Sequence, residues 1–145
     1  HMAEAPAPLN QNPAFGEVDV VRMAYVAPTD AQARAESEEG ITRHMKSFLA
    51  GGDKTGGYLG DVTEKEDDSQ FSYDNLMNGT ILHGSPDTVI RKIEEFRAVG
   101  TTSIMLHHPP YYGLEKTLDM LRLFAKEVLP HVQAMNAPKV QAAAE

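Results

Sequence analysis

Apolar positions along the chain alternate with the period of a strand in some segments and of a helix in others. Residues 17–27 are rich in β-branched side chains, which predicts a strand. Alternation places its residues on two faces: Val20, Arg22, Ala24 and Val26 on one, and Val21, Met23 and Tyr25 on the other. Shorter apolar runs at 80–83 and 101–108 predict two further strands.

Each predicted strand is followed by a helical pattern. A capping box at 29–32 begins the first helix, and Ala50-Gly51-Gly52 ends it. An apolar stripe predicts the second helix over 86–98, with Ser85 as its N-cap and Pro86 in its first position. The third helix begins near Leu114 and continues to about residue 133.

The predicted strands and helices form three β-then-α units, at 17–50, 80–100 and 101–133. This order predicts an α/β fold of parallel βαβ units. We expect a tag scar and flexible tail at 1–16, one domain at 17–135 with an irregular insertion at 51–79, and a second flexible tail at 136–145. Phe71, Tyr73, Leu76 and Met77 in the insertion indicate a short helix or a lid, and the charged run 64–68 indicates a solvated surface.

Composition narrows the class of protein. The 145 residues carry a formal net charge of −8, which argues against nucleic-acid or anionic-membrane partners. There is no cysteine, so disulfides, thiolate nucleophiles and zinc–sulfur sites are excluded, and a cytoplasmic location is expected. No apolar run approaches the roughly 18 residues of a membrane span.

Three motifs resemble the C-terminal portion of the luciferase-like flavin-dependent monooxygenases. They are Tyr-Val-Ala-Pro-Thr-Asp-Ala-Gln-Ala-Arg at 25–34, Gly-Ser-Pro-Asp-Thr-Val at 84–89 and Leu-Phe-Ala-Lys-Glu-Val-Leu-Pro at 123–130. The resemblance covers most of 17–133 and is weakest in 51–79. It implies a TIM barrel, of which this chain would form a partial, three-unit piece.

The same resemblance implies an oxidoreductase that uses FMN, or a deazaflavin, to oxidise a small organic substrate with O₂. A whole barrel takes about 250 residues, so we expect the chain to be a fragment, one half of a split gene or a truncated relative, and to be inactive when isolated. Implied partners are a flavin reductase and either further copies of the chain, giving an oligomer, or a complementary chain. The alternative is a non-catalytic binding or assembly module that retains part of the barrel.

Two histidines near strand ends are candidates for chemistry. Alternation turns Ile104 and Leu106 toward the helices and places His107 on the barrel-interior face, at the mouth where active sites of this fold lie. His107 could therefore hydrogen-bond a flavin edge or act as an acid or base, or it could be an ordinary polar strand end. His83 also lies at the end of a predicted strand, and the argument that it takes part in chemistry is weaker.

The remaining candidates border the same mouth. Gly84 and Ser85, at a helix N-terminus, either bind a phosphate or only cap the helix, and Asp87 in the first turn favours capping. Tyr111 and Tyr112 either line a pocket or cover apolar surface. No metal site is expected, because His107 and His108 are adjacent on a strand and should point to opposite faces.

Overall fold

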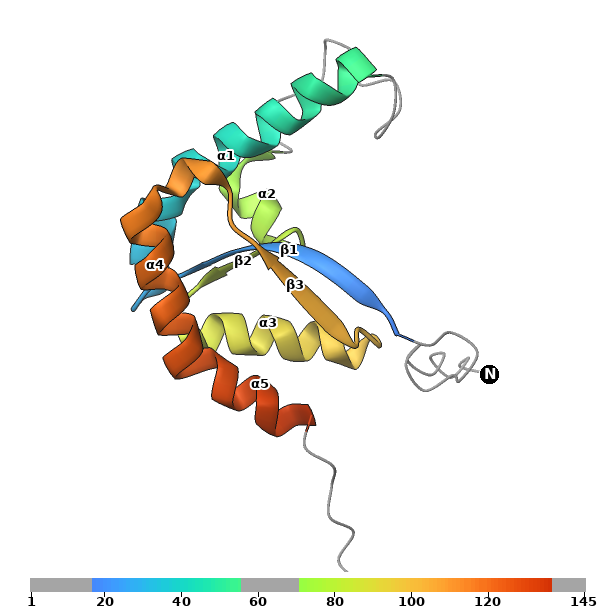
Figure 1. Ribbon diagram of the computed structural model, residues 1–145, viewed down its shortest axis with the longest axis vertical. Helices are drawn as coiled ribbons and strands as arrows, with labels where there is room; N and C mark the ends of the chain where they lie inside the picture. Colours follow the sequence, from blue (N-terminus) through green and yellow to red (C-terminus); the bar gives the residue numbers. More distant parts are fainter. Residues whose placement is uncertain (1–16, 56–70, 137–145) are drawn as a thin grey trace, which may run out of the picture.

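A computed structural model describes residues 17–55 and 71–136, and only the backbone of 48–55 and of 136. Its three strands are β1 (Asp19–Val26), β2 (Ile81–Gly84) and β3 (Ser103–His107). They form one parallel sheet in the order β2-β1-β3. The predicted α/β fold of parallel βαβ units is thereby confirmed (Figure 1). The tail segments 1–16 and 137–145 and the charged run 64–68 lie outside the described residues.

Helices cover both faces of the sheet. Helix α1 (Asp30–Thr55) and helix α3 (Pro86–Ala98) contact β2 from opposite sides. The predicted end of the first helix at Ala50-Gly51-Gly52 is wrong, because α1 continues through both glycines to Thr55. Glycine lowers helix propensity by only about 1 kcal/mol, so the two residues do not force a stop. The short helix α2 (Tyr73–Met77) confirms the helical prediction within 51–79.

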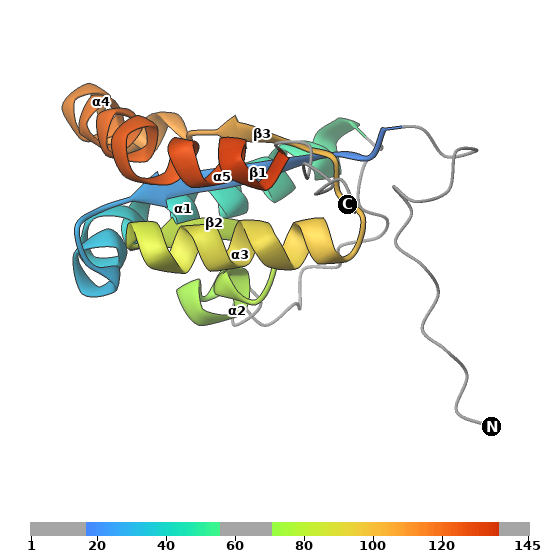
Figure 2. The ribbon, with the colours of Figure 1, turned by 90° about the horizontal axis from the view of Figure 1, so that it is seen from below.

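The C-terminal part is one long helical run with an irregular turn. A 3₁₀ turn, η3 (Pro110–Tyr112), leads into α4 (Leu114–Leu123), a π segment η4 (Phe124–Val128) and α5 (Leu129–Asn136). Pro130 lacks a backbone N–H and its ring would clash with the preceding turn of an α-helix. The wider π turn immediately before Pro130 accommodates that ring, which is why the helix is deformed there and not ended. Figure 2 shows this run beside the sheet, with α3 lying below the strands.

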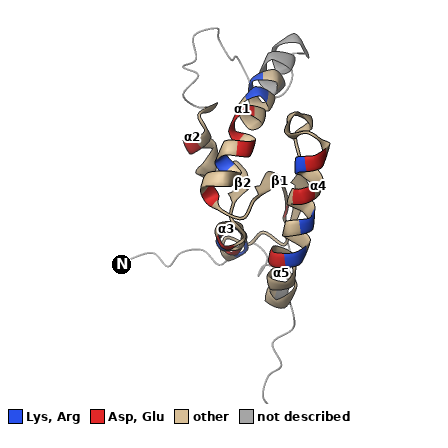
Figure 3. Ribbon diagram, turned by 90° about the vertical axis from the view of Figure 1, so that its left-hand side faces the viewer, with Lys and Arg blue, Asp and Glu red and all other residues tan. Residues whose placement is uncertain are grey.

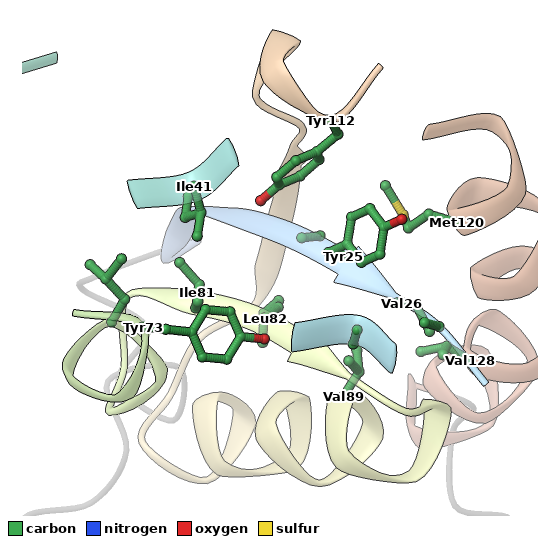
Figure 4. Close-up of a cluster of buried hydrophobic side chains, with 14 of the residues drawn as sticks. Tyr25, Val26, Ile41, Tyr73, Ile81, Leu82, Val89, Tyr112, Met120 and Val128 are labelled. Carbon is green, nitrogen blue, oxygen red and sulfur yellow. The ribbon is translucent and has the colours of Figure 1, made fainter. Parts of the chain in front are cut away.

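The predicted alternation in β1 agrees with the contacts. Tyr25 contacts α1 through Glu36, whereas the guanidinium of Arg22 lies 4.6 Å from the ring centroid of Phe96 on α3. Figure 4 shows the same division among buried side chains, with Ile41 of α1 on one side of the sheet and Val89 of α3 on the other. Arg22 thus points toward the helix α3 and donates to the Val21 carbonyl at 2.8 Å.

The strand order places the first strand at the centre. In a barrel of consecutive units each strand pairs with the next one, but here β3 pairs with β1 and not with β2. Val21 and Met105, which are partners in the β1–β3 register, keep 56% and 66% of their surface exposed on the α1 side of the sheet. Part of that face is therefore left uncovered by the described residues.

Charge is concentrated on the helices. Figure 3 shows acidic and basic residues interspersed along α1 and along α4, while the sheet carries few. Two of the ion pairs are Arg34–Glu38 at 2.9 Å and Arg122–Asp119 at 2.9 Å, each within one helix. None of the described helices is long and apolar enough to cross a membrane.

The strand order predicts an engineered disulfide. Because Val21 and Met105 are register partners, the double variant Val21→Cys/Met105→Cys should oxidise within one chain, since neighbouring strands lie about 4.8 Å apart and a disulfide tolerates Cα separations up to about 6.8 Å. The chain has no cysteine of its own, so free-thiol titration after mild oxidation reports the bond directly.

Val99→Cys/Met105→Cys is the matched control, because both residues are exposed but do not pair. If both thiols of the Val21→Cys/Met105→Cys variant still titrate in the native protein after oxidation, β3 does not lie beside β1.

Candidate functional site

A fully buried histidine lies where three segments of the chain meet. His83 is on β2 and has no exposed surface. Its Nδ1 lies 2.9 Å from the Ser37 hydroxyl on α1, and its Nε2 lies 2.8 Å from the Tyr112 hydroxyl in η3. Both ring nitrogens therefore have partners, as a buried polar group requires. We call His83, Ser37 and Tyr112 the buried triad.

The hydrogen bonds around His83 indicate which ring nitrogen carries the proton. Ser37 donates to the Ala33 carbonyl at 2.6 Å, and we therefore assign the tautomer in which the Ser37 oxygen accepts from His83 Nδ1–H. Nε2 is then an acceptor, and the Tyr112 hydroxyl donates to it. Burial, and to a smaller extent the positive charge of Lys92, lowers the pKa of His83 to about 3. The ring is neutral at physiological pH.

Tyrosines enclose the triad. The Tyr25 ring meets the Tyr112 ring edge-on at 4.9 Å between centroids, and the Tyr73 ring lies 5.6 Å from that of His83. The Tyr25 hydroxyl donates to Glu36 at 2.8 Å. Burial is the main cause that raises the pKa of Tyr25, and this hydrogen bond is the second. Figure 4 shows Tyr25 and Tyr112 converging from the sheet and from η3. Tyr112 is thus a buried core residue.

Gly40 on α1 makes room for this arrangement. A Cβ at position 40 would lie 2.8 Å from Cδ1 of Tyr112. That distance is too short for real carbon atoms, so a side chain there would displace the ring that donates to His83. The helix α1 therefore contributes both a hydrogen-bond partner, Ser37, and a gap at Gly40 to the same site.

A second group of rings lies at the carboxyl end of β3. The His107 ring is 5.6 Å from that of His44 on α1, and His44 is 6.3 Å from Tyr111. The Arg43 guanidinium lies 4.6 Å from the centroid of the Tyr111 ring. Burial, and to a smaller extent the charge of His107, lowers the pKa of His44. His107 and Tyr111 are exposed, in contrast to the triad. We call His44, His107 and Tyr111 the carboxyl-end cluster.

His107 and His108 do not diverge as strand alternation predicts. Their rings are nearly parallel, with an angle of 6° between the ring planes and 6.4 Å between the ring centroids. The reason is that β3 ends at His107, so His108 no longer follows the pleat. Across the described residues no group of three or more His, Cys, Asp or Glu side chains is arranged to hold a metal ion.

The N-terminus of α3 is closed by a carboxylate. Asp30 accepts from the Ser85 N–H at 2.6 Å and from the Thr88 hydroxyl at 3.0 Å, and Ser85 caps the helix by accepting from the Thr88 N–H at 3.4 Å. The Ser85 hydrogen bond is the main reason that the pKa of Asp30 is lowered. The predicted cap is present, and the position that a phosphate would take holds Asp30.

Gly84 is shaped by the same contact. Its φ of +144° is rarely adopted by residues with a side chain, and a Cβ there would lie 2.8 Å from the Asp30 carboxylate oxygen. Gly84 is thus required for the close approach of Asp30 to α3.

The structure regroups the residues that the sequence singles out. It joins His83 with Tyr112 in the buried triad and keeps His107 with Tyr111 at the surface. Sequence reasoning missed Ser37, Glu36, His44 and the carboxylate of Asp30 as a cap. Ser37 was the most detectable of these, because Ala33, Ser37 and Ile41 recur every four residues and form the buried stripe of α1.

The triad predicts a specific acid sensitivity. The pKa of His83 is about 3 in the folded chain, below the ordinary value of 6.5, so the unfolded chain binds the proton more readily between these values. The stability that neutral His83 contributes is complete above pH 6.5 and is lost as the pH falls, by at most about 1.4 kcal/mol per pH unit. His83→Gln should flatten the pH dependence of the unfolding free energy between pH 6.5 and 4.5, measured with urea.

His108→Gln is the matched control, because His108 is exposed and should keep the wild-type slope. Equal slopes for His83→Gln and wild type would show that His83 is not buried in its neutral form.

Known proteins provide an independent comparison. No protein-family model matches the chain. It is 32% identical over 122 residues to 2,5-diketocamphane 1,2-monooxygenase 2 of Pseudomonas putida, a match that covers 79% of this chain and 34% of that protein. The chain therefore spans about a third of the length of this curated relative.

Solved structures give the same result. The oxygenating constituent of 3,6-diketocamphane monooxygenase from Pseudomonas putida, a type II Baeyer–Villiger monooxygenase in complex with FMN, is 27% identical, with a TM-score of 0.56 over 78% of this chain and 33% of that one. Monooxygenase RslO1 from Streptomyces bottropensis, at 22% identity, has a TM-score of 0.56 over 82% of this chain and 34% of that one, and supports the fold. Over most of its length the chain is therefore similar to about a third of these monooxygenases, which agrees with the predicted resemblance to the luciferase-like flavin-dependent monooxygenases.

Proposed function

We propose that this chain forms part of a flavin-dependent, luciferase-like monooxygenase that oxidises a small organic substrate with O₂. The observation that carries the proposal is the 27% identity to an oxygenating constituent solved with FMN. We infer FMN as the flavin on that ground. The relatives named for diketocamphanes suggest a ketone as the substrate class.

The described residues do not fit an FMN phosphate by themselves. The capped N-terminus of α3, which follows β2, is filled by Asp30, whose negative charge repels a phosphate. Active sites on this fold are built from loops around the whole barrel mouth. We therefore propose that a competent site needs barrel units in addition to the described ones, such as a complementary chain or further copies of this one would supply.

The carboxyl-end cluster is the part of the chain proposed to face that site. His107 is exposed at a strand end, beside His44 and Tyr111, and a histidine there can hydrogen-bond a flavin edge or exchange a proton with substrate. When bound, the reduced flavin supplies the oxygen chemistry. A flavin reductase is the proposed source of its electrons.

A non-catalytic binding or assembly module is the second candidate. The observation that favours it is the same Asp30 carboxylate, which stabilises α3 and excludes a phosphate from its N-terminus. The two candidates differ in what an assembly with the remaining barrel units would do. Only the first predicts that the assembly binds flavin and turns over.

The experiment is a flavin titration of the chain alone and in complex. Alone, the chain should leave FMN fluorescence unquenched at low micromolar concentration, with its mass measured by light scattering. Coexpressed with the complementary two-thirds of the diketocamphane relative, it should bind FMN and consume O₂ with a ketone. In that complex His107→Ala should lower kcat at least tenfold, whereas His108→Ala should not.

Stoichiometric FMN binding by the isolated monomer would contradict the proposed need for further barrel units. A folded complex without flavin binding would favour the assembly module. Equal kinetics for the two alanine variants would remove His107 from the site.

A further inference from the structure

An apolar cavity lies on the face of the sheet opposite the buried triad. It has a volume of about 410 Å³ and is bounded by α3, β3 with the two residues before it, the π segment and α5. Small-molecule sites typically have volumes of about 300–1,000 Å³. The cavity thus has room for a compact organic ligand.

Its walls are mostly hydrophobic. The apolar side chains that line it are Ile93, Ile104, Leu106, Phe124, Leu129, Val132 and Met135. Ile93 is buried, Leu129 is exposed and the others are half-buried, so most of this apolar surface has limited contact with bulk water. An apolar ligand body would cover surface that the protein itself leaves unpaired.

One cation borders the cavity. Arg97, in the last turn of α3, lines it and makes no ion pair or side-chain hydrogen bond with another described residue. No acidic residue is among the described residues that line the cavity, although the chain as a whole has a net charge of −8. The Thr101 hydroxyl also lines the cavity without a partner among the described residues.

We propose that this cavity binds an amphipathic monoanion, a carboxylate or sulfonate on a compact apolar body. The apolar body lies against Ile104 and Val132, and the anionic head accepts hydrogen bonds from Arg97 at the mouth. A guanidinium suits this role because it is always charged and presents paired donors to an oxyanion.

The site is separate from the proposed catalytic edge. Ile104 and Leu106 alternate with His107 along β3, so they face α3 and α5 while His107 lies on the other side. Occupancy would join α5 to α3 and β3, because the ligand would contact all three elements. By mass action a ligand that binds only the folded chain raises its melting temperature.

Octanoate titrated into the full chain tests the proposal, followed by the methyl NMR signals of Ile104 and Val132. Saturable binding with a Kd of about 1 mM or tighter is expected for a ligand of this size. Arg97→Gln should weaken octanoate binding at least fivefold. Octanamide, the neutral analogue, should bind wild type at least fivefold more weakly than octanoate.

The matched control is Arg91→Gln, an exposed arginine on the same helix that does not line the cavity, which should leave the Kd within twofold. Val132→Phe, which fills the cavity, should abolish the methyl shifts of Ile104. Absence of saturable binding, or equal affinities for octanoate and octanamide, would overturn the proposal. So would an unchanged Kd in Arg97→Gln, which does not depend on whether the cavity-filling variant folds.

Discussion

The fold depends on a neutral histidine that has a partner at each ring nitrogen. His83 connects Ser37 on α1 with Tyr112 in η3, residues 46 and 29 positions away in sequence. A buried imidazole without partners would lose its hydration with nothing in return, at a cost of about 1–3 kcal/mol for each unsatisfied group. Satisfying both nitrogens ties the first helix, the edge strand and the turn after the last strand into one unit.

Asp30 provides the second long-range link, and it bears directly on function. Its carboxylate accepts from the first turn of α3, which it reaches because Gly84 has no side chain in the way. The contact stabilises the helix N-terminus and occupies the place of an external anion. The N-terminus of α3 is therefore satisfied by a carboxylate of the chain itself.

Much of the secondary structure could be predicted because its causes are local. The Ser85 cap and Pro86 predict the start of α3, and the alternation in β1 correctly divides Tyr25 from Arg22. The strand order could not be read in this way, since the pairing of β1 with β3 depends on contacts between distant segments. The end of α1 was predicted wrongly because two glycines lower helix propensity without forcing the helix to stop.

The contacts of the candidate residues could not be predicted, for the same reason. Sequence alone favours His107 over His83, because both follow short apolar strands and His107 matches the expected barrel mouth. What distinguishes them is three-dimensional: His83 is completely buried and paired, whereas His107 is exposed beside His44. Pairing of His83 with Ser37 has no sequence signature beyond the buried stripe of α1.

The central claim, that His83 is a neutral hydrogen-bonding link, is tested most directly by long-range ¹H–¹⁵N NMR of the histidine rings. The His83 signals are identified by their absence in His83→Gln, among the six histidines of the chain. The account predicts a single tautomer protonated at Nδ1, with nitrogen shifts that do not change between pH 7.5 and 5. A ring protonated at Nε2, or one that titrates near its ordinary pKa of 6.5, would contradict it.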